Sequence, residues 1–474
     1  MRDQLRDELR DESKRYFAPT AWVDGAWAND VLLTVASDGT WANIQAHAGA
    51  DQQRGATRLG GPVLPGVVNA HSHAFQRAIA GMTERAKTGG KVGQDNFWSW
   101  RDRMYSVANR ITPRQLEAIA SLLYAELLMA GYTQVCEFHY LHNDVDGKPY
   151  ADPLEMSSAL VRAAQCVGIG ITLLPALYMR SGFGASGLRD DQQRFASSPD
   201  SIFKLVEGIE KQLGGGLVNS GLALHSLRAV GQGALQEAAA FAKGRSMPVH
   251  IHVAEQTGEV ADCVNALGQR PVEWLLSHAN LDASWNLVHA THTTADELRA
   301  VAASGASIVL CPTTEANLGD GVFDLPTYAR LKGSWSIGSD SHVTRSWQEE
   351  LRMLEYSQRL ALRQRNVMAG ASGEPSTATA LFNAALAGGT AACGLRMGGL
   401  AIGNRADFSV MDTRSPSLLG VANNHLLDAM IFSSPDARMS DVYVAGKLVV
   451  QTGHVENWQG LADGFSNAMR QLLA

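Results

Sequence analysis

Short apolar runs alternate with helix-like stretches through the middle of the chain, and this alternation predicts the main fold. Eight such runs lie between about residues 62 and 400, at 67–69, 134–138, 171–175, 221–224, 248–253, 286–288, 307–311 and 335–338. Continuous apolar runs suit strands that are covered on both faces, as in a parallel sheet. Eight strands separated by helices predict a TIM-like (β/α)8 barrel, whose chemistry lies where the strands end.

The two ends of the chain follow a different pattern, with short alternating segments broken by Gly and Asp. These segments lie at 21–27, 31–35, 407–412 and 442–450. Such alternation predicts strands with one covered face. We therefore expect residues 1–61 and 401–474 to form one small β-sandwich-like domain with a C-terminal helix, and residues 62–400 to form the barrel.

The first fifteen residues alternate acids and bases and contain no apolar core. We expect a solvated helical extension there, and neither a signal peptide nor an anchor. No run in the chain approaches the roughly 18 apolar residues of a membrane span.

Composition narrows the class of protein. The 474 residues are 45% hydrophobic and 18% charged, as in soluble globular proteins. A net charge of −7 offers no basic surface for nucleic acid. The five cysteines are scattered and show no Cys-x-x-Cys spacing, which argues against a disulfide framework and a cysteine zinc site and favours a cytoplasmic location.

Histidines and ionisable residues gather at the ends of the predicted strands. In chain order they are His71 and His73, Glu137, His139 and Tyr140, His225 and Arg228, His250, His252 and Glu255, His289 and His292, and Asp340 and His342. His71 and His73 are two residues apart, so on a strand they point to one face and could share a metal ion. Two hydrogen-bonded surface histidines would have the same spacing. Core packing gives no reason for so many histidines at strand ends, because a buried imidazole needs partners.

An ordered set of motifs resembles a known family. The motifs are Pro65-Gly-x-x-Asn-x-His71-x-His73, His252-Val-Ala-Glu255, His289 at a strand end, and Ser339-Asp340. They resemble the deaminase and chlorohydrolase branch of the amidohydrolase superfamily over essentially the whole chain. The resemblance implies one divalent metal ion, Zn²⁺ with Fe²⁺ as the alternative, and a homodimer. The implied metal ligands are His71, His73, His252 and Asp340.

The resemblance also implies catalytic roles for Glu255, His289 and Asp340, and the chemistry of these residue types agrees with it. Neutral imidazoles and one carboxylate suit zinc or a similar ion, which lowers the pKa of a bound water to about 7. Asp340 would accept the proton of that water, Glu255 would protonate a departing nitrogen, and His289 would polarise the attacked group. This set predicts hydrolysis at an sp² carbon that bears nitrogen.

The remaining histidines of the strand ends are expected to support the site or the fold. His250 alternates with His252, so only one of the two can face the barrel interior, and the resemblance selects His252. We interpret the others likewise as structural or supporting residues, namely His139, His142, His292 and His342.

Further motifs resemble those members of the branch that act on linear amidines with two carboxylates. They are His71-Ser-His73-Ala-Phe-Gln76-Arg, Phe97-Trp-Ser-Trp-Arg101-Asp-Arg103, Glu137-Phe-His-Tyr140, and His225-Ser-Leu-Arg228. The implied partner is a small-molecule dicarboxylate, and arginine binds carboxylates bidentately. The implied substrate-binding residues are Gln76, Arg101, Tyr140, His225 and Arg228, and the choice of Arg101 over Arg103 stays open.

Two other functions remain open at this point. The segment 81–104 is either a functional lid or a surface insertion, and its aromatic residues 97–100 would also suit a deaminase of a neutral ring, such as guanine, cytosine or an adenosine-like compound. A catalytically silent scaffold barrel is the more distant alternative, because every expected metal and acid-base position is filled.

Overall fold

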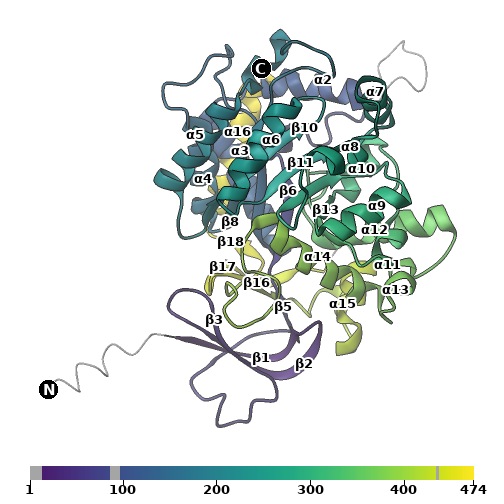
Figure 1. Ribbon diagram of the computed structural model, residues 1–474. Helices are drawn as coiled ribbons and strands as arrows, with labels where there is room; N and C mark the ends of the chain where they lie inside the picture. The colour runs from purple at the N-terminus through teal and green to yellow at the C-terminus, as the bar shows by residue number, and fades with distance from the viewer. Residues whose placement is uncertain (1–12, 86–96, 434–436) are drawn as a thin grey trace.

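A parallel barrel forms the larger part of the protein (Figure 1). The computed structural model describes residues 13–85, 97–433 and 437–474. Within these residues the barrel strands are β6 (Val67–Ser72), β7 (Tyr132–His139), β8 (Gly170–Leu177), β10 (Leu222–Ser226), β11 (Val249–Val253), β12 (Trp285–His289), β13 (Ser307–Leu310) and β14 (Ser334–Ile337). They lie side by side in chain order, and a short strand β9 (Val218–Ser220) pairs with β8. The predicted TIM-like barrel is confirmed.

The barrel closes where the first strand meets the chain beyond the last. Ser72 and Asp340 form a parallel bridge. The backbone N–H of Asp340 donates to the carbonyl of His71 (3.0 Å), and the N–H of His73 donates to the carbonyl of Asp340 (3.3 Å). A Cβ atom at Gly338 would lie 2.6 Å from the Cβ of His71, so only glycine permits this approach. Closure of the barrel thus places Asp340 beside both histidines.

Gly338→Ala is therefore expected to destabilise the protein by about 1–3 kcal/mol, because the added methyl group forces β14 away from β6. Metal binding should weaken with it. Urea unfolding and metal content measure the two effects. Gly233→Ala is the matched control, since a Cβ at Gly233 meets nothing within 4 Å. Equal stability of the two variants would contradict the close contact.

Helices surround the barrel and close one of its ends (Figure 1). The described helices of the central part are α2 (Phe97–Ala108), α3 (Pro113–Ala130), α4 (Glu155–Val167), α5 (Pro199–Gly208), α6 (Gln232–Gly244), α7 (Thr257–Leu267), α8 (Pro271–His278), α9 (Ala295–Ser304), α10 (Pro312–Leu318), α11 (Leu325–Arg330), α12 (Trp347–Leu362), α13 (Val367–Ser372) and α14 (Thr377–Cys393). α14 packs where the strands begin, and a Cβ at its Gly388 would lie 1.9 Å from the carbonyl oxygen of Trp335. Its small residues let it close this end, which leaves the opposite end for the site.

Both ends of the chain build the second sheet, as predicted. Its strands are β1 (Lys14–Val23), β2 (Ala26–Val35), β3 (Trp41–Gln45), β4 (Thr57–Arg58), β5 (Val63–Pro65), β15 (Phe408–Met411), β16 (Met439–Val444), β17 (Lys447–Gln451) and β18 (His454–Val455). β5 pairs with both β1 and β15, so it joins the two contributions. Phe408 and Tyr443 stack with ring centroids 4.2 Å apart in its core. Only Gly66 separates β5 from β6, so the sheet leads directly into the barrel.

The expected helical extension is wrong for its last residues. Residues 1–12 lie outside the described part of the chain, but Lys14 and Arg15 open strand β1 and pair with Val35 and Thr34 of β2. The turn at Asp24-Gly25 forms a long hairpin, and its ladder of backbone hydrogen bonds extends into the charged segment. Charge alternation therefore did not decide the local structure here.

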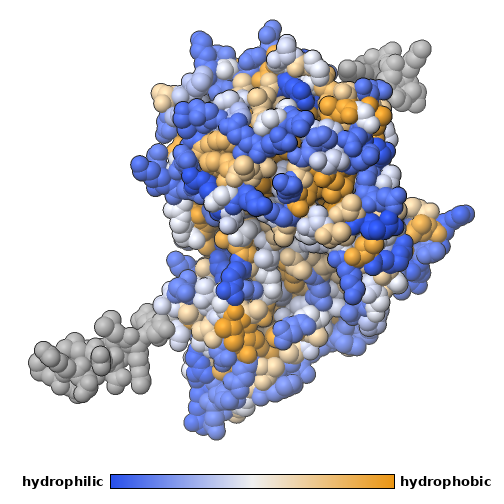
Figure 2. Space-filling model, viewed as in Figure 1, coloured by the Kyte–Doolittle hydropathy of each residue, from blue (hydrophilic) through white to orange (hydrophobic). Residues whose placement is uncertain are grey.

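The helices α15 (Leu426–Phe432) and α16 (Trp458–Leu473) follow the second sheet's strand β15 in the chain, and α16 packs against α3 of the barrel (Figure 1). Among the described residues, no helix has the length and apolar character that a membrane span requires. The face in Figure 2 is largely hydrophilic, with apolar patches over both the barrel and the second sheet.

Candidate active site

One pocket at the ends of the barrel strands contains every predicted site residue except His71, which lies fully buried behind His73. The predicted residues that line it are His73, Gln76, Arg101, Tyr140, His225, Arg228, His252, Glu255, His289 and Asp340. The lining also includes Phe97 and Trp100, which belong to the aromatic segment considered for ring binding, and Met104, Tyr105 and Leu318, which had no predicted role. The barrel thus brings residues from six of its strand ends, and from helix α2, into one place.

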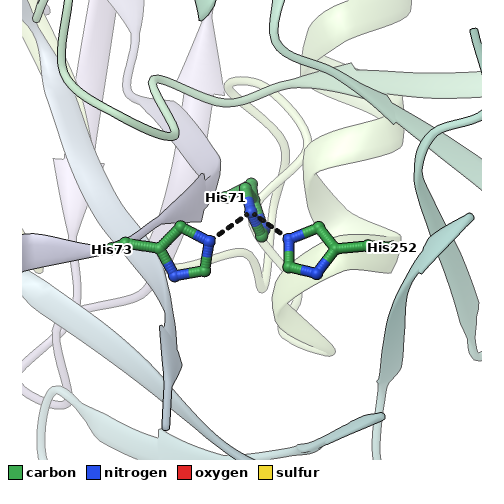
Figure 3. Close-up of side chains that lie close together, drawn as sticks. All are labelled: His71, His73 and His252. Atoms are coloured by element: carbon green, nitrogen blue, oxygen red, sulfur yellow. Dashed lines mark hydrogen bonds between the residues drawn. The ribbon is translucent and has the colours of Figure 1, made fainter. Parts of the chain in front are cut away.

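Three histidines converge on a single point (Figure 3). The Nε2 atom of His71 lies 3.2 Å from that of His73 and 3.0 Å from that of His252. His73 Nδ1 contacts the carbonyl of Phe138 at 2.8 Å, and His252 Nδ1 contacts that of His225 at 2.9 Å. A carbonyl only accepts, so Nδ1 carries the proton in both rings and each Nε2 presents a lone pair to the centre.

Asp340 completes this set of donors, because its Oδ1 lies 3.5 Å from the Nε2 atoms of both His71 and His73. Ligand atoms at bond lengths of about 2.0–2.1 Å in a tetrahedral zinc site are about 3.3 Å apart. With Nδ1 protonated in His73 and His252, the Nε2 atoms of both rings are free to bind a cation. Spacing and donor chemistry therefore fit a divalent metal ion.

Burial keeps the three imidazoles neutral. It lowers the pKa of His71, His73 and His252, and the neighbouring histidines lower the pKa of His71 and His252 further. Metal ligation requires the neutral form of histidine, so burial favours the state that binds.

Two buried residues, Glu137 and His342, fix the segment from His71 to Ala74 by hydrogen bonds. The carboxylate of Glu137 accepts hydrogen bonds from Ser72 Oγ (2.7 Å) and from the N–H of Ala74 (2.6 Å). His342 Nε2 contacts the carbonyl of His73 at 3.1 Å. Burial raises the pKa of Glu137 to about 8, although these hydrogen bonds lower it. These contacts orient the two ligands.

The candidate acid-base residues face one another across the pocket. His289 Nε2 lies 3.7 Å from Glu255 Oε1 and 3.9 Å from Asp340 Oδ2. Burial raises the pKa of the Glu255 carboxyl. Burial lowers the pKa of His289, but the carboxylate of Glu255 and a hydrogen bond to Glu315 outweigh it and raise the pKa overall. Glu255 and His289 thus form a coupled pair that is suited to hold a proton and to donate it within the pocket.

Backbone strain marks two of these residues. His289 has φ of 68° and Asp340 has φ of 43°, both in the left-handed region that side chains disfavour. Strain of this kind persists where the surrounding structure holds a side chain in a required direction, as at functional sites.

Glu315 belongs to the site, although no motif pointed to it. Its Oε1 lies 3.2 Å from His289 Nδ1 and accepts the N–H of Cys311 at 2.9 Å. It therefore sets the direction of the His289 ring. Its position could have indicated it from the sequence, because Glu315 lies in the first turn of α10, directly after the seventh barrel strand. No candidate residue had been assigned to the end of that strand.

The two arginines of the pocket have different surroundings. Burial lowers the pKa of Arg228, but the carboxylates of Glu259 and Glu255 and the Tyr178 hydroxyl outweigh it and raise the pKa. Arg101 lies over the ring of Tyr105, 5.5 Å from its centroid. Arg103 donates instead to the carbonyls of Met82 and Arg85 and does not line the pocket. Arg101 is thus the arginine of α2 that faces the site.

Three neutral polar residues, Gln76, Tyr140 and His225, also line the pocket. Gln76 Nε2 contacts the hydroxyl of Tyr140 at 3.4 Å. Its buried Oε1 has no hydrogen-bond partner among the described residues, so it can accept one from a ligand. The ring of His225 lies 4.3 Å from that of Tyr178.

The other strand-end histidines contact backbone or one another. His250 Nε2 contacts the carbonyl of Ala392 at 2.8 Å, and His142 Nε2 contacts the carbonyl of Ala176 at 2.9 Å. His292 Nε2 contacts the carbonyl of Asp320 at 2.8 Å. The centroid of the His139 ring lies 5.3 Å from that of the His142 ring. These contacts fit the supporting roles expected for them.

The amidohydrolase family model matches residues 63–449. The chain belongs to the amidohydrolase family. It is 45% identical to the formimidoylglutamate deiminase of Pseudomonas aeruginosa, over 96% of this chain and 99% of that protein. A 5-methylthioadenosine/S-adenosylhomocysteine deaminase of Halobacterium salinarum is 26% identical over 76% of this chain and 75% of its own. The protein is therefore a hydrolase that acts on C–N bonds. The alternative prediction of a catalytically silent scaffold barrel is wrong.

Solved structures agree with this family. The crystal structure of an amidohydrolase from Brucella melitensis is 42% identical, with a TM-score of 0.90 over 97% of this chain and 100% of that one. An adenosine deaminase from Xanthomonas campestris with bound zinc is 20% identical, with a TM-score of 0.79 over 97% of this chain and 98% of its own. The second likeness concerns the fold alone.

Proposed function

We propose that this amidohydrolase hydrolyses N-formimino-L-glutamate to N-formyl-L-glutamate and ammonia, a step of histidine degradation. The observation that carries the proposal is the presence of Arg101 and Arg228 in one pocket with the converging histidines. A dicarboxylate needs such cations, especially in a protein with a net charge of −7. The relative named formimidoylglutamate deiminase, at 45% identity, supports the same reaction.

The reaction needs one divalent metal ion, for which we propose zinc. His71, His73, His252 and Asp340 would hold it, as their spacing and donor atoms fit. When bound, the ion supplies a water that is activated near neutral pH and a positive charge beside the attacked carbon.

The acid-base residues then move protons around the formimino carbon. Asp340 accepts a proton from the attacking water as its oxygen bonds to that carbon. His289 donates a hydrogen bond to the attacked group and stabilises the charge that develops there. Glu255 protonates the terminal imino nitrogen, which becomes an amino group, and the proton held by Asp340 reprotonates Glu255. Asp340 then takes the second proton of the water's oxygen as the formyl C=O bond forms, while Glu255 gives its proton to the amino nitrogen, whose bond to carbon breaks to release ammonia. Return of the proton from Asp340 to Glu255 restores both residues.

The remaining polar residues orient the substrate. Arg228 lies close to Glu255 and so suits the carboxylate nearer the reacting carbon, while Arg101 on α2 suits the distal one. Gln76 Oε1 is available to accept a hydrogen bond from the substrate N–H. The Tyr140 hydroxyl and His225 provide further polar contacts in the pocket.

Arg228→Met is expected to raise KM for N-formimino-L-glutamate by roughly tenfold or more, because a charge-assisted hydrogen bond is lost, with a smaller change in kcat. Steady-state kinetics measure both. Arg103→Met is the control, since that arginine does not line the pocket. An unchanged kcat/KM for Arg228→Met would place the carboxylate site elsewhere.

A deaminase of a neutral ring is the second candidate, because Phe97 and Trp100 line the pocket and could stack on a ring. Ammonia release by the zinc-loaded protein, measured with N-formimino-L-glutamate beside guanine, cytosine and adenosine, separates the two. We expect release from the formimino compound alone. If ammonia were released only from a ring compound, the proposed roles of the metal and acid-base residues would stand, but the proposed dicarboxylate substrate would be wrong.

We also propose a cytoplasmic homodimer. The cysteines support the location, since all five are free thiols. The homodimer rests on the family resemblance.

A further inference from the structure

Helix α2 supplies part of the lining of the pocket. Five of its residues line the pocket, namely Phe97, Trp100, Arg101, Met104 and Tyr105. The helix follows β6 in the chain but belongs to none of the barrel's repeating strand and helix units. Its position, and that of Arg101, therefore depends on contacts with other parts of the chain.

We infer that Arg194 is a positioning residue that holds α2, and thereby Arg101, in place for the distal carboxylate. Arg194 lies on the 3-10 helix η2 (Asp190–Phe195) and is only 2% exposed. Its guanidinium donates to the carbonyl of Ala108 at 2.5 Å and to that of Ile111. The inference rests on the proposed function, because it assigns Arg101 a carboxylate.

The carbonyl of Ala108 is the last of α2, where helix carbonyls lack partners within the helix, and that of Ile111 lies in the short connection from α2 to α3. A cation there also interacts favourably with the helix dipole. A buried guanidinium is costly to leave without acceptors, so the two carbonyls and Arg194 depend on each other. Arg194 therefore ties down the end of α2 rather than a side chain on its surface.

Two neighbours of Arg194 on η2 reinforce the attachment. The side-chain amide of Asn109 donates to the carbonyl of Asp191 at 2.8 Å. Gln192 Nε2 donates to the hydroxyl of Tyr178 at 3.0 Å and contacts that of Tyr105, on α2, at 3.4 Å. Tyr105 is the residue over which Arg101 lies, so this contact is adjacent to the cation itself.

η2 is in turn attached to the barrel. The carbonyl of Arg194 accepts the N–H groups of His142 (3.2 Å) and Asn143 (3.0 Å). The Asn143 amide donates to the carbonyls of Gln193 and Ala196. His142 follows the pocket residue Tyr140 at the end of β7. Arg194 thus connects a barrel strand end, through its backbone, to α2, through its side chain.

Loss of this connection should displace Arg101 but leave the metal-binding histidines in place. Arg194→Met is expected to raise KM for N-formimino-L-glutamate by roughly tenfold, because a charge-assisted contact to the distal carboxylate is weakened. The kcat and the metal content should change little. Turnover of N-formimino-L-norvaline, in which a methyl group replaces that carboxylate, should be unaffected. Arg194→Lys should restore part of the loss, because lysine keeps the charge.

Arg110→Met is the matched control, since Arg110 also donates to a carbonyl of the α2 segment, that of Ser106, but is exposed. A double-mutant cycle with Arg101→Met gives the decisive comparison. If Arg194 acts through Arg101, Arg194→Met should add no further loss of selectivity in the Arg101→Met background. Additive effects, or equal losses on both substrates, would overturn the inference.

Hydrogen exchange of the α2 amides tests the attachment independently of activity. Arg194→Met should speed exchange at residues 104–108 relative to wild type, and Arg110→Met should not. Unchanged exchange would overturn the inference even if the enzyme hydrolyses N-formimino-L-glutamate. Absence of that hydrolysis in the wild-type enzyme would instead overturn the proposed function and the carboxylate assigned to Arg101.

Discussion

Glu255→Gln is expected to keep its metal and to lose about a hundredfold to ten-thousandfold in kcat, the usual contribution of a general acid-base group. The carboxyl lies 3.7 Å from His289 Nε2, and burial raises its pKa, so it is placed to carry the proton that the leaving nitrogen needs. Glutamine preserves the size of the side chain but cannot transfer a proton. Ammonia release and metal content, measured on the same preparation, test this.

Glu297→Gln is the control for this substitution. Glu297 is also buried and lies at the start of a helix, where it pairs with Arg270 at 3.1 Å outside the pocket. Its loss should lower stability and leave kcat near that of the wild type. Near-normal turnover by Glu255→Gln would remove the assigned role, and loss of metal would show that the residue acts on the metal site instead.

Removal of the metal is expected to reduce activity by at least about a hundredfold, because a bound ion contributes several kcal/mol of transition-state stabilisation. Dialysis against a chelator should abolish ammonia release, and stoichiometric Zn²⁺ should restore it. The converging Nε2 atoms of His71, His73 and His252 provide the physical reason, since three imidazole nitrogens this close together can hold one cation.

Two histidines of the same strand provide a matched pair for this experiment. His252→Gln should lose stoichiometric metal, whereas His250→Gln should keep it, because His250 faces the opposite side and contacts the carbonyl of Ala392. Retention of full activity after verified removal of the metal would refute the proposed chemistry. Metal loss in both variants would indicate a general effect on β11.

The sequence by itself determined the barrel and the positions of its strand ends. Apolar runs and their spacing are local properties, and the barrel geometry follows once eight of them alternate with helices. The spacing of His71 and His73 likewise implied a shared direction, because alternate residues of a strand face one side. Ordered motifs then added His252, Glu255, His289 and Asp340, all of which lie at the pocket.

Only the tertiary structure decided which residues far apart in the chain meet. Glu315 contacts His289 across two strand ends, and Arg194 reaches α2 from η2; neither contact leaves a periodic trace in the sequence. The direction of Arg101 rather than Arg103 into the pocket depends on how α2 packs. Strand pairing likewise overrode the charge alternation at Lys14 and Arg15. These features arise from long-range packing and hydrogen bonds, whose geometry exists only once the barrel has closed.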